Sequence, residues 1–157
     1  MDNSSDIVAD PPETRRGRKL FTLDEAQRAL ALVRRIVADI VAEYPHLLEL
    51  QEMLEGLQQV GLITEIRQLQ HQIAASVSKL QDYAAELDEI GVEIRDFTRG
   101  VVDFSAIQDG REIKLCWRFG EPQIRHWHEV GAGVGDRKLI GGYRPVARAA
   151  PRKLERS

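Results

Sequence analysis

Two histidines late in the chain have the spacing of a metal site carried on a β-strand. His126 and His128 lie two residues apart in residues 124–130, a segment that we interpret as a strand. Successive side chains of a strand point to opposite faces, so both imidazoles lie on one face, about 6.5–7 Å apart along the backbone. Two imidazoles at this distance can bind one metal ion. The structural alternative is a pair of ordinary hydrogen-bonded sheet residues.

Three carboxylates at predicted strand ends or turns are candidate oxygen ligands for the same ion. They are Asp96, Asp103 and Glu121. A site made of imidazole and carboxylate groups suits zinc, iron, manganese or nickel, so a divalent transition metal is the expected cofactor. The predicted metal ligands are therefore His128, Asp103, Glu121, Asp96 and His126.

The single cysteine and two of these carboxylates also have purely structural interpretations. Cys116 is either a soft sulfur ligand or an inert, partly buried thiol. Asp103 can cap a turn instead of binding a metal. Glu121 can form an ion pair with Arg118 or Arg125, and such a pair contributes about 0–1 kcal/mol when exposed.

These side chains belong to the second half of the chain, where the sequence pattern predicts a sheet. After Gly91 the hydrophobic period changes from 3.6 to 2, and Asp109-Gly110 is a strong signal for a tight hairpin turn. Residues 112–119 alternate between apolar and polar without a break. The pattern predicts a small antiparallel sheet of three or four strands within residues 92–130.

Two long helices are predicted before the sheet, over about residues 23–57 and 63–89. Thr22 and Glu25 form a capping-box pattern at the start of the first helix. Both segments carry apolar residues in alternating steps of three and four, which is the pattern of helices that pair along a seam. Pro45 lies inside the first segment and should bend the helix, and Gly91 is a natural end for the second. The expected fold class is α+β, a long antiparallel helical hairpin followed by the sheet.

The hairpin carries apolar positions beside its seam, and these favour a homodimer. They are Ala29, Ile36, Leu50, Leu57 and Ile90. The sheet can cover one end of the hairpin, but the far end has no obvious partner within the chain. A second copy of the chain is the simplest cover, and it would give a four-helix bundle around a two-fold axis.

Composition and charge narrow the class of protein. The chain has 157 residues, 43% of them hydrophobic, which fits one domain over about residues 19–140. We expect residues 1–18 to be a disordered arm and residues 141–157 a disordered basic tail. No apolar run approaches the roughly 18 residues that a membrane span needs, so no membrane partner is expected. One cysteine favours a reducing, cytoplasmic setting.

The distribution of charge argues against a folded nucleic-acid-binding surface. Residues 20–90 have a net charge of −7, whereas residues 137–157 have a net charge of +6. A nucleic-acid-binding domain usually gathers its basic residues on one folded face. Binding to nucleic acid is therefore expected only through the basic tail, whose other interpretation is a solvated end.

Several segments resemble a known bacterial family. They are residues 19–26, 91–96, 100–104 and 110–121, together with Trp127-His128, and the Leu115-Cys116-Trp117 step is the most specific. Over about residues 19–140 the chain resembles the domain of unknown function family 2203. The resemblance implies a cytoplasmic prokaryotic protein with a helical hairpin and a small β part, and it implies no activity.

The resemblance also implies which residues a shared site would use. These are Asp96, Asp103, Arg111, Glu121, His128 and Arg137. In such a site His128 would be a ligand or general base, and Arg111 and Arg137 would bind an anion. The chain departs from the family pattern at His126, where relatives more usually have an aromatic residue, and at residues 133–137.

These observations predict a non-catalytic oligomeric interaction protein that assembles through its helical hairpin. The alternative is a small metal- or anion-binding enzyme with a His/carboxylate site on the β part, so the sequence leaves open whether the protein is an enzyme. A third interpretation is a nucleic-acid accessory protein that acts through the basic tail.

Overall fold

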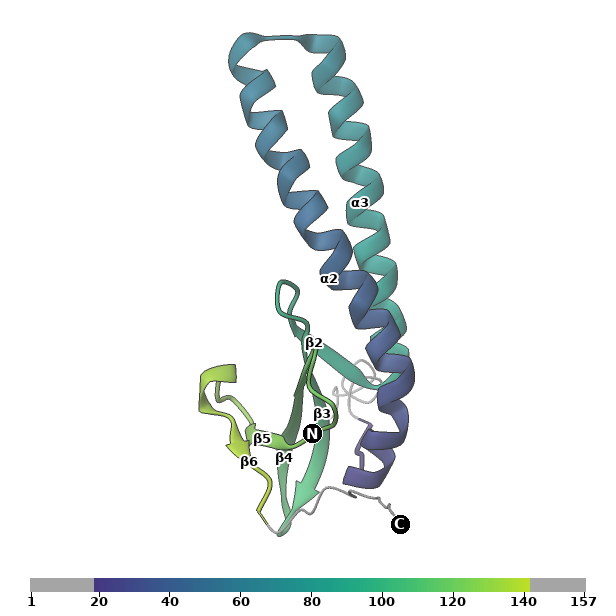
Figure 1. Cartoon of the computed structure of the whole chain (residues 1–157), viewed down its shortest axis with the longest axis vertical. Helices are drawn as coiled ribbons and strands as arrows, with labels where there is room; N and C mark the ends of the chain where they lie inside the picture. The colour runs from purple at the N-terminus through teal and green to yellow at the C-terminus, as the bar shows by residue number, and fades with distance from the viewer. Residues whose placement is uncertain (1–18, 142–157) are drawn as a thin grey trace, which may run out of the picture.

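The fold is a long helical hairpin with a small sheet packed beside its base (Figure 1). The structure is a computed structural model, and it describes residues 19–141. Within these residues the elements are α2 (Leu23–Val60), α3 (Ile63–Ile90), β2 (Val92–Asp96), β3 (Val101–Gln108), β4 (Arg111–Arg118), β5 (His126–Glu129), the 3-10 turn η1 (Val134–Asp136) and β6 (Lys138–Leu139). The predicted α+β architecture is confirmed. The predicted arm and nearly all of the predicted basic tail lie outside the described residues.

The first helix starts at the predicted capping box. Glu25 N donates to Thr22 Oγ1 at 3.1 Å, and Thr22 N donates to Glu25 Oε1 at 2.9 Å. These two bonds satisfy backbone donors that would otherwise have no partner in the first turn. Pro45 lies inside α2, and the buried positions continue after it with Leu47 and Leu50, so the apolar stripe keeps its phase across the proline.

The chain reverses within two residues at the far end of the hairpin. Gly61 ends α2 in the left-handed conformation, with φ 74°, and its N–H donates to Leu57 O at 2.9 Å. Leu62 then precedes α3 and makes no side-chain cap. At the other end of α3, Gly91 adopts φ 100° and leads directly into β2. Glycine suits both positions because a side chain disfavours this backbone conformation.

The five strands found in the described residues form one antiparallel sheet in the order β2-β3-β4-β5-β6. Asp109 and Gly110 both have positive φ, 54° and 79°, so they form the two-residue turn that the sequence predicts. This turn sets the register of β3 and β4, in which Gln108 pairs with Arg111 and Asp103 pairs with Cys116.

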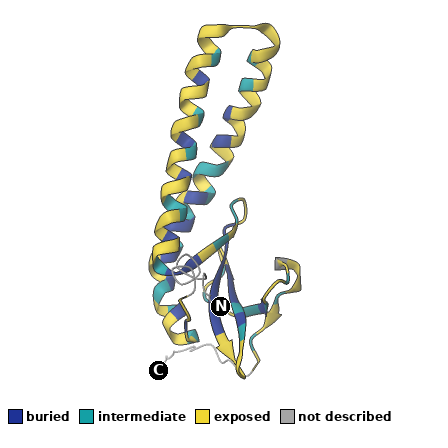
Figure 2. Cartoon of the chain, turned by 180° about the vertical axis from the view of Figure 1, so that it is seen from behind, coloured by how far each residue is buried: buried dark blue, intermediate teal, exposed yellow. Residues whose placement is uncertain are grey.

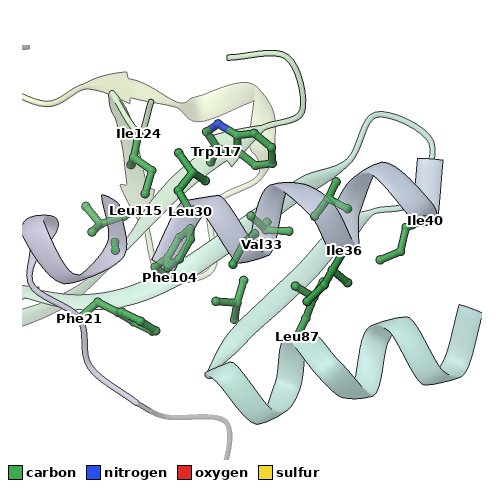
Figure 3. Close-up of a cluster of buried hydrophobic side chains, with 14 of the residues drawn as sticks. Phe21, Leu30, Val33, Ile36, Ile40, Leu87, Phe104, Leu115, Trp117 and Ile124 are labelled. Carbon is green, nitrogen blue, oxygen red and sulfur yellow. The ribbon is translucent and has the colours of Figure 1, made fainter. Parts of the chain in front are cut away.

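The core lies where one face of the sheet meets the base of the hairpin (Figure 3). Phe104, Leu115 and Trp117 from the sheet pack with Leu30, Val33, Ile40 and Leu87 from the helices, and with Phe21 and Ile124. Phe21 meets Phe104 edge to face with ring centroids 5.2 Å apart. Of the alternating positions predicted to face the core, Ile113, Leu115 and Trp117 are buried.

Three details differ from the expectations and have clear physical reasons. The sheet has a fifth strand, Lys138–Leu139, which is too short to show alternation and is held by pairing with His126 and Trp127. Asp103, predicted near a strand end, lies inside β3, because β3 continues to Gln108. Ile36 and Leu50, expected to need a second copy as cover, are already buried within one chain.

The second face of the sheet is polar and points away from the hairpin. On β3 and β4 the alternation that turns Phe104 and Leu115 to the core turns Asp103 and Cys116 to this face. No helix in the described part of the chain has the length and apolar content that a bilayer span requires.

Candidate functional site

Three residues of different chemistry meet on the polar face of the sheet, one on each of three neighbouring strands. Asp103 of β3 pairs directly with Cys116 of β4. His128 of β5 pairs with Lys114, two residues from Cys116 on the same face, so it lies diagonally across from the cysteine. One ligand atom from each of Asp103, Cys116 and His128 lies within 4.8 Å of the other two. We call these three residues the Asp–Cys–His cluster.

The cluster is buried although it lies on the face opposite the helices. The side chains of Asp103 and His128 are each 1% exposed, and Cys116 is fully buried. His128 Nε2 lies 3.0 Å from Asp103 Oδ1 and 3.1 Å from Oδ2. Arg95 of β2 approaches the same carboxylate, with Nη1 3.7 Å from Oδ2. Buried charged groups are stable only with such close partners.

The second ring nitrogen of His128 is fixed by the backbone. His128 Nδ1 lies 2.8 Å from Glu129 O. A carbonyl oxygen only accepts hydrogen bonds, so Nδ1 carries a hydrogen and donates it. Nε2, which faces Asp103, is therefore the ring nitrogen that would take a second proton or a metal ion. A ring fixed in this way is the usual arrangement of a metal-binding histidine.

The thiol of Cys116 is held in its neutral form when no cation is present. Burial, followed by the negative charge of Asp103, raises the pKa of Cys116 to about 12. A thiol with such a pKa is a poor nucleophile, which agrees with the inert-thiol interpretation. A bound cation reverses this preference, because a coordinating thiol loses its proton.

A second polar cluster lies beside the first and contains three more of the predicted residues. Arg137 Nη2 donates to Glu121 Oε1 and Oε2 at 2.7 and 2.8 Å, and it lies 3.0 Å from His126 Nδ1. Because a guanidinium only donates, His126 Nδ1 is the acceptor. Burial, followed by the charge of Arg137, lowers the pKa of His126. We call Glu121, His126 and Arg137 the edge cluster.

The remaining predicted site residues do not join either cluster. Asp96 Oδ1 accepts from Thr98 N at 2.8 Å and from Arg99 N at 2.9 Å, so it caps the turn between β2 and β3. Arg111 forms an ion pair with Glu129 at the exposed rim of the sheet. Thus His128 contacts Asp103, whereas His126 and Glu121 both contact Arg137. Within residues 19–141, Asp96 contacts none of these residues and caps a turn. Both arginines proposed for an anion already contact a carboxylate.

Two members of the site lie outside the predicted ligand set. The sequence offers Cys116 only as an additional soft ligand, and it does not indicate Arg95. The signal for Cys116 was present in the sequence: a two-residue Asp109-Gly110 turn places residue 103 opposite residue 116 by counting back along both strands. No comparable signal places Arg95.

Comparison with known proteins gives a family and no further relatives. A family model described as an uncharacterized conserved protein matches residues 19–140. The match covers both helices and all strands of the sheet, and therefore both polar clusters. A search of curated proteins and a search of solved structures found no match. The chain belongs to the domain of unknown function family 2203, as the resemblance in its sequence indicated.

Proposed function

We propose that the protein is a non-catalytic interaction protein that forms a homodimer through the far end of its helical hairpin. The observation that carries the proposal is the exposure of residues 51–68, which we call the hairpin tip. The structure describes all of these residues, and none of them is buried. Figure 2 shows the tip as mainly exposed, in contrast to the base of the hairpin.

The tip exposes large apolar side chains that no other part of residues 19–141 covers. Met53, Val60 and Ile63 are 56%, 66% and 63% exposed, and Leu62 between the helices is also exposed. The helix α2 has 38 residues and is therefore about 57 Å long, and its contribution to the hydrophobic core ends at Leu47. Clustered exposed apolar side chains on a projecting element are typical of an interaction surface.

The charges beside the tip favour a second copy of this chain as the partner. Glu49, Glu52 and Glu55 line a hollow of about 330 Å³ on α2, whereas Arg67 lines a hollow of about 490 Å³ on α3 together with His71. A two-fold axis that places α2 of one copy against α3 of the other would bring the three glutamates opposite Arg67 twice. Such complementarity fixes the register of a pair more than it adds affinity.

The geometry gives less support to the alternative, a small metal- or anion-binding enzyme. Arg111 and Arg137 each contact a carboxylate, so neither offers a free charge to an anion. The Asp–Cys–His cluster is at most 2% exposed, which supports a held ion more than a turnover site. We keep a cytoplasmic location as part of the proposal, because the single cysteine is a buried free thiol.

The mass of the full-length protein in solution tests the dimer. We expect light scattering at micromolar concentration to give twice the chain mass of 17.8 kDa. Replacing Met53, Val60 and Ile63 together with Gln should weaken the dimer at least about tenfold, because each change removes apolar surface from the contact. Helix content should stay the same, since all three side chains are exposed.

Leu139→Gln is the matched control, because Leu139 is 69% exposed but lies on β6 at the opposite end of the molecule. Its dimerisation should match that of the wild type. High salt should also weaken the wild-type dimer by screening the attraction between the three glutamates and Arg67. A wild-type mass of one chain at micromolar concentration would refute the proposal.

A further inference from the structure

We propose that Asp103, Cys116 and His128 form a buried site for one divalent transition metal ion, zinc by preference, that cross-links strands β3, β4 and β5. The proposal does not depend on the dimer, because the cluster lies on the sheet face that points away from the hairpin. Its basis is the placement of three different metal-binding groups within 4.8 Å of one another at a buried position.

The hydrogen bonds of His128 require a positive species between the imidazole and the carboxylate. Nδ1 donates its hydrogen to Glu129 O at 2.8 Å, so the neutral ring has a lone pair on Nε2. That lone pair faces both oxygens of Asp103, at 3.0 and 3.1 Å, and a carboxylate only accepts. Two acceptors at this distance repel each other unless a second proton or a metal ion lies between them.

The set of donors distinguishes a metal from a proton. A proton between His128 and Asp103 uses two of the three groups and leaves Cys116 as a neutral thiol hydrogen-bonded to Asp103, whereas a metal ion would bind all three. A tetrahedral zinc ion binds imidazole nitrogen at about 2.0–2.1 Å, carboxylate oxygen at about 2.0–2.2 Å and thiolate sulfur at about 2.3 Å. Donors held at these distances lie about three to four ångströms from one another. The Nε2–Oδ1 separation is 3.0 Å and all three donor atoms lie within 4.8 Å, so small side-chain shifts would bring the set onto one ion.

The chemistry of the three donors selects the class of metal. A thiolate and an imidazole favour zinc-like transition metals, whereas magnesium and calcium prefer oxygen ligands alone. A divalent ion with one carboxylate, one thiolate and one neutral imidazole is electrically neutral, and the neighbouring cation, Arg95, has a side chain that is 34% exposed. Neutrality matters here because the side chains of Asp103 and His128 are each 1% exposed, and an uncompensated buried charge is strongly unfavourable.

The surrounding contacts orient the donors as in a built metal site. The Glu129 carbonyl fixes the ring of His128. Nη1 of Arg95, a residue of β2, lies 3.7 Å from Asp103 Oδ2. Support of this kind around the ligands commonly changes metal affinity by about 10–100-fold. Because the ligands come from three adjacent strands, the ion would hold the register of the sheet, and its role would be structural.

Cobalt(II) binding to the full-length chain tests the site. Since the donors are buried, the protein is unfolded in guanidinium with a chelator, then refolded with cobalt chloride, and unbound metal is removed by gel filtration. We expect one cobalt ion per chain, with visible bands of a tetrahedral centre and a thiolate-to-cobalt charge-transfer band. Zinc chloride should displace the cobalt and abolish these bands.

One variant and a matched control test the thiolate ligand. Cys116→Ser keeps the volume and removes the thiolate, so it should lose the charge-transfer band and bind at least about tenfold more weakly. The matched control is His126→Gln. His126 lies two residues from His128 on β5 and pairs directly with Cys116 of β4, but its side chain belongs to the edge cluster. It should bind cobalt as the wild type does.

The proposal is overturned if the refolded wild type has native circular dichroism and retains no metal, or if the charge-transfer band persists in Cys116→Ser. Equal loss of metal in His126→Gln would also overturn it. Should Cys116→Ser not fold, nitrogen-15 spectra of the wild-type histidines decide. A His128 Nε2 without a proton in the metal-treated protein supports the site, and a doubly protonated ring refutes it.

Discussion

Gly100→Ala should strongly destabilise the protein, because this glycine sits where the turn between β2 and β3 meets helix α2. Gly100 has φ 73°, a backbone conformation that costs a residue with a side chain about 1–2 kcal/mol. A Cβ at this position would lie 2.7 Å from Val37 Cγ1, 2.8 Å from Phe119 Cβ and 2.9 Å from Val41 Cγ1. Overpacking of this kind costs about 1–3 kcal/mol more.

The two terms predict a loss of about 2–5 kcal/mol in the free energy of unfolding, which is a large part of the stability of a small domain. Gly110→Ala separates the backbone cost from the overpacking cost. Gly110 has nearly the same φ, 79°, but no atom lies within 4 Å of an added Cβ. It should cost only the backbone term, about 1–2 kcal/mol.

Guanidinium unfolding followed by circular dichroism measures both variants. We expect the midpoint of Gly100→Ala to fall well below that of Gly110→Ala, with an unchanged slope, because the surface exposed on unfolding is the same. Equal midpoints for the two variants would refute the reasoning, since they would show that α2 and the turn are not in close contact. The hydrogen bond from Phe119 N to Gly100 O, 3.0 Å long, would then also have to be reconsidered.

Two further predictions concern the start of α2 and the buried thiol. Thr22→Ala should cost about 1 kcal/mol in unfolding free energy, because it removes half of the capping box. The pKa of Glu25 should stay lowered, because the backbone N–H of residue 22 that lowers it is kept. Thr98→Ala at an exposed turn should change neither quantity. In the metal-free protein Cys116 should not react with a thiol reagent at pH 8 and should react fully in guanidinium, because burial raises its pKa to about 12. The folded pKa lies above the ordinary value of 9.0, so this contribution to stability is complete below about pH 9 and is lost as the pH rises toward 12. Rapid labelling of the folded protein at pH 8 would contradict that prediction.

The helices were predictable because their sequence signals are local. The capping box at Thr22, the heptad spacing and the glycine at position 91 each specify helix geometry over a few residues, and the structure confirms both helices. The periodicity does not specify which part of the protein covers each apolar face of the helices. Ile36 and Leu50 were expected to need a second copy, yet both are buried within one chain.

The site was predictable only as far as strand register could be counted. The Asp109-Gly110 turn fixes β3 against β4, and therefore Asp103 against Cys116. The seven residues between β4 and β5 give no such count, so the position of His128 relative to this pair depends on tertiary packing. For the same reason the sequence does not show that His126 and His128 contact different groups. Residues on one strand face can have different neighbours, and here His128 contacts Asp103 whereas His126 contacts Arg137.

The composition of the sheet is evidence that the body of the protein has a task besides carrying the hairpin. An antiparallel sheet with one face on the core commonly leaves its other face solvated, and such a face needs no buried charge. Here that face holds Asp103 and His128 at 1% exposure each. Replacing a buried ion pair with apolar residues is often neutral or stabilising, so such a pair is weak evidence of a role in stability alone. A requirement for specific donors at this position explains the arrangement better, and it makes the two proposals separable: variants of the hairpin tip should change the mass of the assembly but not cobalt binding, and variants of the Asp–Cys–His cluster should do the reverse.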